Sequence, residues 1–285
     1  MRRFQLLSSL LTLFILASVT GLGQIETPRP SPLGKIEQTV GIMKVTIEYS
    51  RPGVKGRKIF GGLVPYGQVW RTGANSPTLI SFSDSLKVQG NKVPAGKYSL
   101  YTIPGESEWT VILNKKVTGG AQLDEKEDLL RFKVPSKGTA GPVETMTFSV
   151  TNVKTNAASV ELSWENTMVG FGLEFDVDSR VMGQIDEVMK EPFADVASTY
   201  YQSASYYYNN GKDLKKAQDW VIKSIDLEPE SFVAWRLKAQ IQAGLKDYDA
   251  AIATAKIAIE KAEKAKNEEF VKFNQDAIAE WEKMK

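Results

Sequence analysis

The segment "MKVTIEYS" (Met43–Ser50) alternates between apolar and polar side chains. Val45, Ile47 and Tyr49 fall on one face of an extended chain, and polar residues take the other face. Successive side chains of a β-strand point to opposite faces, so this period of two is typical of a half-buried strand. The segment therefore predicts a sheet with one buried side.

Further short segments rich in β-branched and aromatic residues follow along the chain. They are "TLISFS" (78–83), "KYSLYTI" (97–103), "WTVILN" (109–114), "LLRFKV" (129–134), "ETMTFSVTNV" (144–153) and "SVELSWE" (159–165). Turn signals such as Pro52-Gly53 and Pro104-Gly105 separate several of them. Short strands at intervals of about ten residues predict an antiparallel β-sandwich or jelly-roll domain over residues 36–176. No long helical pattern lies between them, which argues against a parallel α/β sheet.

The first residues of the chain have a different character. Arg2 and Arg3 precede an apolar run from Leu6 to Val19, and small residues follow it. This order predicts a secretory signal peptide over residues 1–23. The run is shorter than the ~20 residues of a bilayer span, so a permanent anchor is only the alternative. The proline-rich stretch after it predicts an extended leader over residues 24–35.

The composition excludes several classes of chemistry. The chain has no cysteine and no histidine. Disulfides, zinc sites of the usual kind and Ser-His-Asp triads are therefore excluded, and no cofactor or metal is expected. Without Arg2 and Arg3 the basic residues number 36 − 2 = 34 against 34 acidic ones, so neither nucleic acid nor an anionic membrane surface is an expected partner. We expect an exported protein, periplasmic or extracellular, that is soluble after cleavage and has no remaining membrane span.

The apolar spacing becomes helical from about Arg180. Two segments there align with each other at an offset of 235 − 201 = 34 residues, which matches Tyr201 with Trp235 and Ala217 with Ala251. Paired helices with a period of about 34 residues resemble the tetratricopeptide repeat. The last segment, up to Trp281, has the single apolar stripe of a capping helix. We therefore predict a helical, repeat-like domain over residues 177–285, with a plain helical bundle as the alternative.

One stretch of the β domain, residues 49–78, is unusually rich in arginine, glycine and aromatic residues. It contains "YSRP" (49–52), "KGR" (55–57) and "IFGGLVPYGQVWRTGAN" (59–75), and "VPAGKYSLYTIPG" (93–105) follows it. Glycines at this density relax the backbone and allow close passage of chains, so we expect an ordered loop rather than a strand.

These motifs, with "EWTVILN" (108–114) and "DLLRFKV" (128–134), resemble the domain of unknown function family 2911 of exported bacterial proteins. The resemblance covers roughly residues 30–175. It implies a compact all-β domain and no established activity. The chain departs from the pattern at Ser76-Pro77, where an acidic residue and an alanine are expected before Thr78.

Two interpretations of the arginine-rich stretch stay open. In the first, Arg71 is structural, stacks on an aromatic ring and pairs with a carboxylate such as Glu48 or Glu144, while Asn75 holds a turn. In the second, the stretch forms a site for a small polar ligand or sugar, in which arginine and asparagine bind oxygen atoms and aromatic rings form walls. The predicted ligand-binding residues are Arg51, Arg57, Tyr66, Trp70, Arg71 and Asn75. An interface with a partner protein is a further alternative.

The helical domain offers a second candidate surface, for a peptide or protein partner. Helical spacing places Tyr201, Ala204, Ser205 and Tyr208 on one stripe, which we expect to be core. The opposite, polar face predicts peptide-binding residues Gln202, Tyr206, Asn209, Arg236 and Gln240. An ordinary solvated face is the alternative.

Catalysis has little support in the sequence, and no catalytic residue is assigned. General acid–base chemistry would depend on the strand glutamates, which are Glu48, Glu144, Glu161 and Glu165. The acidic run "DEKED" (124–128) lacks the spacing of a calcium loop. We therefore predict a cell-envelope binding or scaffolding protein, and the alternative is a carboxylate-dependent hydrolase of carbohydrate or cell-wall material.

Overall fold

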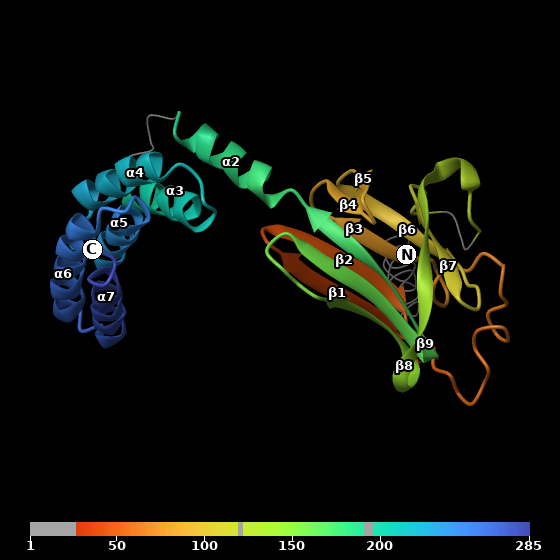
Figure 1. Ribbon diagram of the computed structural model, residues 1–285. Coiled ribbons are helices and arrows are strands. Elements are labelled where there is room, and N and C mark those ends of the chain that lie inside the picture. Colours follow the sequence, from red (N-terminus) through yellow and green to blue (C-terminus); the bar gives the residue numbers. More distant parts are fainter. Residues whose placement is uncertain (1–26, 119–121, 191–195) are drawn as a thin grey trace, which may run out of the picture. The chain divides into compact units, whose positions relative to one another are not determined.

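The computed structural model describes residues 27–118, 122–190 and 196–285. The predicted signal peptide (1–23) and the first residues of the predicted leader lie outside these ranges. The chain divides between Val177 and Asp178 into two compact units, a β domain followed by a helical domain (Figure 1).

The described residues of the β domain form nine strands and one 3₁₀ turn. The strands are β1 (Leu33–Val40), β2 (Met43–Ser50), β3 (Thr78–Phe82), β4 (Leu86–Val88), β5 (Asn91–Val93), β6 (Gly96–Ile103), β7 (Glu108–Asn114), β8 (Asp128–Thr151) and β9 (Ala157–Phe175), and the turn η1 covers Glu125–Glu127. The strand β1 begins at Leu33, which the sequence placed in the leader, because its backbone pairs with the end of β2 at Ser50.

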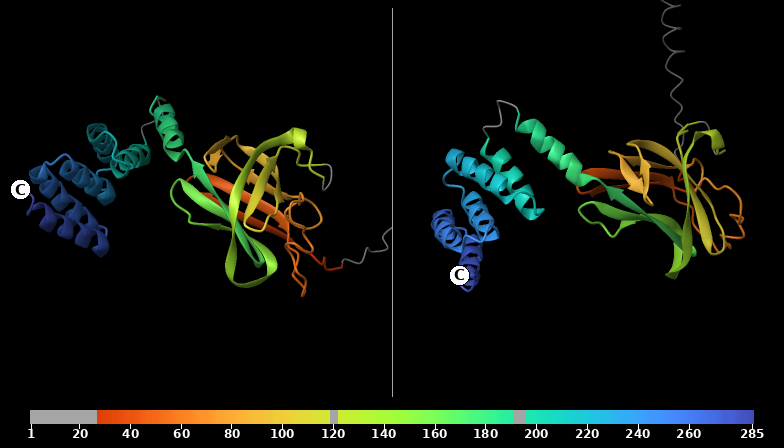
Figure 2. Two further views of the ribbon diagram at one scale, coloured as in Figure 1. Left: turned by 45° about the vertical axis from the view of Figure 1, so that its right-hand side comes forward. Right: turned by 45° about the horizontal axis from the view of Figure 1, so that its top comes forward.

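All neighbouring strands are antiparallel, in the order β1-β2-β3-β6-β7-β8-β9-β4-β5. The long strand β8 pairs with β7 up to Pro135 and with β9 from Ser136 onwards. It therefore carries the chain from one layer to the other, and with β9 it forms a long twisted hairpin (Figures 1 and 2). The sequence predicted two strands here. Pro135 lies where β8 changes partners, a position at which proline is tolerated.

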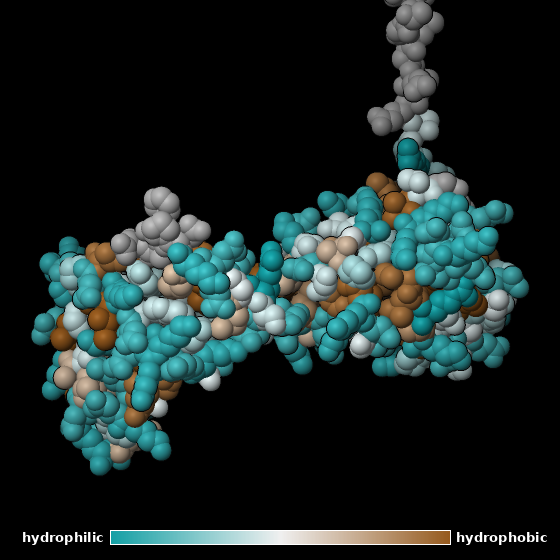
Figure 3. Space-filling model, turned by 90° about the horizontal axis from the view of Figure 1, so that it is seen from above, coloured by the Kyte–Doolittle hydropathy of each residue, from teal (hydrophilic) through white to brown (hydrophobic). Residues whose placement is uncertain are grey.

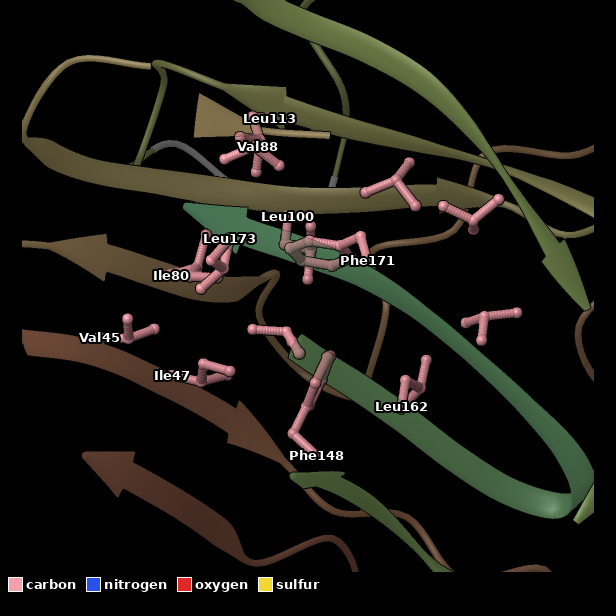
Figure 4. Packing of buried hydrophobic residues seen from close by; sticks show 14 of the residues in the cluster. Val45, Ile47, Ile80, Val88, Leu100, Leu113, Phe148, Leu162, Phe171 and Leu173 are labelled. Carbon is pink, nitrogen blue, oxygen red and sulfur yellow. The ribbon is translucent and has the colours of Figure 1, made fainter. Parts of the chain in front are cut away.

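The two layers enclose a single core. Side chains of β2, β3 and β6, among them Ile47, Ile80 and Leu100, face those of β8 and β9, among them Phe148 and Leu173 (Figure 4). The apolar face predicted for β2 is buried, as the alternation requires. Hydrophilic residues cover most of the surface seen in Figure 3, with apolar residues in scattered patches.

The stretch between β2 and β3 is an ordered loop, as predicted. Its β-bridges to the sheet are isolated ones, from Gly53 to Thr145 and from Trp70 to Thr102. A further bridge within the loop joins Phe60 to Val64. The loop is thus attached to β8 near its start and to β6 near its end.

Six helices follow in the described part of the chain. They are α2 (Val177–Val188), α3 (Ala197–Asn209), α4 (Leu214–Leu227), α5 (Phe232–Gly244), α6 (Tyr248–Lys264) and α7 (Glu268–Trp281). From α3 to α7, each helix packs on the next one along the chain, and α5 also packs on α3 and α7 (Figure 1).

Two helices of this unit begin at equivalent places. The side chains of Asp213 and Asp247 accept backbone N–H groups at the starts of α4 and α6, and they lie 247 − 213 = 34 positions apart. Such N-caps satisfy donors that a helix leaves free. The internal period read from the sequence is therefore also a period of helix starts.

The buried stripe of α3 differs from the predicted one. Tyr200, Ser203, Ala204 and Tyr207 are buried, whereas Tyr201, Ser205 and Tyr208 are only partly covered. The face of α3 that meets α4 is centred on Tyr207, whose ring packs edge-to-face on Trp220 with the centroids 4.8 Å apart. A helical stripe can be misassigned by one residue because neighbouring positions differ by only ~100°.

No helix of the described residues combines the length and the apolar character that crossing a bilayer requires.

One buried hydrogen bond ties β2 to β8. Tyr49 is 3% exposed, and its hydroxyl accepts a hydrogen bond from the backbone N–H of Phe148 at 3.1 Å. Tyr49→Phe leaves that N–H without a partner, so we expect the free energy of unfolding to fall by about 1–2 kcal/mol. Urea denaturation measures this change. The control Tyr66→Phe, at an exposed ring, should leave stability unchanged, and equal effects of both variants would contradict this role.

An ion-pair cluster joins the start of α5 to the end of α6. Glu230 accepts hydrogen bonds from the ammonium groups of Lys261 and Lys264, which lower its pKa from 4.5 to about 2. A lowered carboxylate pKa means that the stabilisation is complete above pH ~4.5 and is lost as the pH falls towards about 2. An NMR titration should find this low pKa, and Lys261→Gln combined with Lys264→Gln should return it towards 4.5. A pKa that is unchanged in the double variant would refute this cause.

Candidate functional site

A hollow of about 310 Å³ opens in the β domain beside the loop between β2 and β3. Its walls come mainly from that loop, with Trp164 of β9 and Ser31 added from outside it. The lining residues are Ser31, Pro52, Arg57, Leu63, Val64, Pro65, Gln68, Val69, Trp70, Arg71, Gly73, Ala74 and Trp164. Pockets for small ligands commonly have volumes from ~300 Å³ upwards. The lining includes two arginines and no carboxylate.

Trp70 is held in a cluster of aromatic rings. Its indole stacks on Trp164 at a centroid distance of 5.9 Å, and the edges of Phe60 and Trp109 pack against it. The backbone of Trp70 exchanges two hydrogen bonds with Thr102, of 2.8 and 2.9 Å. The indole N–H donates to the carbonyl of Gly73 at 3.1 Å. Trp70 is therefore fixed on both its backbone and its ring.

The residue after Arg71 sets the direction of the loop. Thr72 is fully buried and has a positive φ of 55°, which is a rare conformation for a β-branched residue. Its hydroxyl lies within hydrogen-bond distance of the Thr102 hydroxyl and donates to the carbonyl of Trp70. Its own carbonyl accepts a hydrogen bond from the Thr78 hydroxyl at 2.6 Å. Left-handed residues of this kind cost on the order of 1–3 kcal/mol and persist only where the surroundings impose them. The reversal at Thr72 positions Arg71 on the wall of the hollow.

Arg71 itself lacks the structural partners that one interpretation required. Its Nε atom is buried without a hydrogen-bond partner among the described residues. Glu48 pairs instead with Lys97 at 3.1 Å, and Glu144 accepts the backbone N–H of Lys55 at 3.0 Å. The predicted pairing of Arg71 with Glu48 or Glu144 is therefore not found among the described residues.

The second arginine of the hollow, Arg57, is held by the backbone. Its Nε and Nη2 atoms donate to the carbonyls of Val54 and Gly53, at 3.0 and 2.6 Å. Both acceptors are neutral carbonyl oxygens, so they do not offset the charge of the guanidinium. Arg57 and Arg71 thus both bring positive charge to the lining of one hollow.

The family model described as "Protein of unknown function (DUF2911)" matches residues 31–173, which is half of the chain. The chain belongs to the DUF2911 family. No curated protein and no solved structure matches it. The matched residues begin at Ser31 beside the hollow and include all of its lining, so the hollow is a feature of the DUF2911 domain itself.

Three other residues predicted for the site lie outside the lining. Arg51 joins β2 to β8 by donating to Met146 O at 3.2 Å and to Thr147 Oγ1 at 2.9 Å. The Tyr66 ring lies against Gly61. Asn75, with a φ of 60°, donates to Ser50 and to the carbonyl of Ser31. The DUF2911 domain therefore brings together Arg57, Trp70 and Arg71 of the predicted set.

Other lining residues were not predicted from the sequence. Trp164 is 1% exposed, and its indole N–H has no hydrogen-bond partner among the described residues. The alternation of β9 marks it only as core. Leu63 and Val69 are 49% and 44% exposed, and nothing in their spacing distinguishes them from ordinary loop residues.

The four strand glutamates have different contacts, although Glu144 and Glu165 lie near each other because Val143 pairs with Glu165. Glu165 accepts the backbone N–H of Ile59 at 3.2 Å, so it anchors the loop as Glu144 does. Glu161 lines a different hollow of about 220 Å³ on β8 and β9, and none of the four lines the hollow at Trp70. No group of acidic residues that could hold a metal ion occurs in the described ranges.

The residues predicted to bind peptides lie on two helices. On α3, the Tyr206 hydroxyl donates to Asp178 of α2 at 2.9 Å, Asn209 donates to Ser205, and Gln202 is exposed. Asp178 accepts hydrogen bonds from Lys212 and Tyr206, which lower its pKa, and the bond from Lys212 has the larger effect. On α5, the Arg236 guanidinium lies 5.0 Å from the ring centroid of Phe273 in α7, and Gln240 is partly buried.

Two arginines of the DUF2911 domain should respond differently to the same change. Arg51→Met removes two hydrogen bonds from a charged group, and we expect the free energy of unfolding to fall by about 2 kcal/mol. Arg71→Met removes a buried N–H that has no partner, so stability should stay constant or rise. Thermal and urea denaturation measure both variants. A large loss of stability in Arg71→Met would show that Arg71 is a structural residue.

Proposed function

We propose that the protein is an exported cell-envelope binding protein, and that its DUF2911 domain binds a small anionic ligand in the hollow at Trp70 and Arg71. The proposal rests on Arg71, which has a buried side-chain nitrogen without a hydrogen-bond partner among the described residues. Its Nε atom is buried in the wall of a hollow and has no partner within the described residues. A buried donor without a partner costs about 1–3 kcal/mol, so the fold keeps Arg71 in this wall at a cost in stability.

The charge of the lining indicates the sign of the ligand. Arg57 and Arg71 contribute two positive charges, and the lining contains no aspartate or glutamate. Hydrogen bonds between a guanidinium and a carboxylate or phosphate are about twice as strong as those between neutral groups. An anion therefore suits the hollow better than a neutral sugar does.

Stacking on a sugar ring receives less support. Trp70 already stacks on Trp164 and packs against Phe60 and Trp109, and Tyr66 lies outside the lining. The hydrolase alternative also loses support, because Glu144 and Glu165 hold backbone N–H groups of the loop.

The export proposal rests on the basic and apolar character of residues 1–23.

We further propose that the helical domain contacts a protein or peptide partner, as helical repeats commonly do. The support is the 34-residue spacing of the capped helix starts at Asp213 and Asp247. The exposed Gln202 and Asn209 of α3 are the residues to substitute first in a search for that partner.

Isothermal titration calorimetry with matched pairs of probes tests ligand binding by the β domain. Each pair contains an anion and its neutral counterpart, such as glucuronate with glucose and benzoate with benzamide. We expect an anion to bind at least about tenfold more tightly than its counterpart, and Arg71→Met to remove that preference.

Arg131→Met is the matched control for this experiment. It removes the same charge from an exposed position on β8, where Arg131 pairs with Glu125 and Asp128 and does not line the hollow. Binding should be unchanged in this variant. Equal affinity for anion and neutral counterpart in every pair would refute the proposal.

A further inference from the structure

The lining of the hollow in the DUF2911 domain combines two kinds of side chain. Arg57 and Arg71 contribute guanidinium groups. Leu63, Pro65 and Val69 contribute side chains with no charge and no hydrogen-bonding group. All of these residues belong to the loop between β2 and β3.

The apolar residues of the lining are exposed to a degree that calls for an explanation. Leu63 is 49% exposed and Val69 is 44% exposed, and both line the hollow rather than the core. Scattered exposed apolar residues are normal on protein surfaces. Here they share the lining of one concave space with two arginines, which is the composition of a ligand pocket with a few placed polar groups.

Resting on the proposed function, we infer that the ligand is an amphiphilic carboxylate, with an acid group at Arg71 and an apolar body against Leu63 and Val69. A volume of about 310 Å³ corresponds to the space of roughly ten water molecules at ~30 Å³ each. That space suits a single aromatic or branched aliphatic group with its carboxylate. The ligand could be a free acid or the carboxyl end of a peptide with an apolar last residue.

The loop has the rigidity that such a ligand requires. Trp70 is fixed by its ring cluster and Thr72 by its buried hydroxyl contacts. Val64 shares a backbone bridge with Phe60, and Ile59 is held by Glu165. These contacts fix the loop without a ligand, which reduces the entropy that binding would otherwise cost.

Calorimetry on the full chain with four probes tests the inference. The probes are 3-phenylpropionate, its neutral amide, glucuronate and N-acetyl-phenylalanine. We expect 3-phenylpropionate to bind at least about tenfold more tightly than its amide or glucuronate. The order of 3-phenylpropionate and N-acetyl-phenylalanine distinguishes a free acid from a peptide end.

Two pairs of variants separate the contribution of the apolar lining residues to binding from general effects of substituting an exposed apolar residue. Val69→Ser has the control Val153→Ser, and Leu63→Ser has the control Ile42→Ser, because the members of each pair are almost equally exposed. Val69→Ser and Leu63→Ser should each weaken 3-phenylpropionate about threefold or more and leave glucuronate unchanged. The controls should change neither affinity, and melting temperatures should show that all four variants are folded.

The possible failures are distinguishable. If glucuronate binds as tightly as 3-phenylpropionate, and Arg71→Met weakens both, the ligand is an anion without an apolar requirement. That result overturns this inference and leaves the proposed function standing. If no anion binds more tightly than its neutral counterpart, both are overturned.

Discussion

The packing of Trp70 on Trp164 is the contact on which the rest of the site depends. Trp70 belongs to the loop between β2 and β3, Trp164 to β9, and Trp109 of β7 and Phe60 of the loop complete the cluster. These four rings therefore join an irregular segment to both layers of the domain. Aromatic contacts of this kind add about 0.5–1.5 kcal/mol beyond the area that they bury. A long glycine-rich segment can hold one conformation because its aromatic residues are part of the core.

The loop also contains features that stability alone does not favour. Thr72 adopts a left-handed conformation, and Arg71 places a buried N–H where nothing in the described residues accepts it. Each of these features is of the kind that costs about 1–3 kcal/mol and that tends to occur at functional sites. They lie next to each other in sequence and beside the hollow. The concentration of both in one short segment supports the proposed site at this loop rather than at the strand glutamates.

The helical domain is built on more local rules. Asp213, Asp247 and Asn267 each accept a backbone N–H at the start of a helix, and short loops lead into the next helix. Its core is formed by small and aromatic residues on facing helices, such as Ala217, Ala251 and Tyr207. Such a unit is specified by repetition of capping and packing signals. The β domain, in contrast, needs contacts between residues far apart in the chain, such as Arg51 with Met146.

The sequence by itself determined the order of a β domain and a helical domain, the buried face of β2 and the loop character of the segment around Trp70. These follow from side-chain periodicity and from glycine and proline, which act over a few residues. It also placed Arg57, Trp70 and Arg71 in one candidate site. Only the tertiary structure decided that Arg51 and Asn75 serve as structural ties, and that Trp164, Leu63 and Val69 complete the hollow. The reason is physical: whether a polar atom finds a partner depends on which distant strand passes beside it, and no local pattern records that.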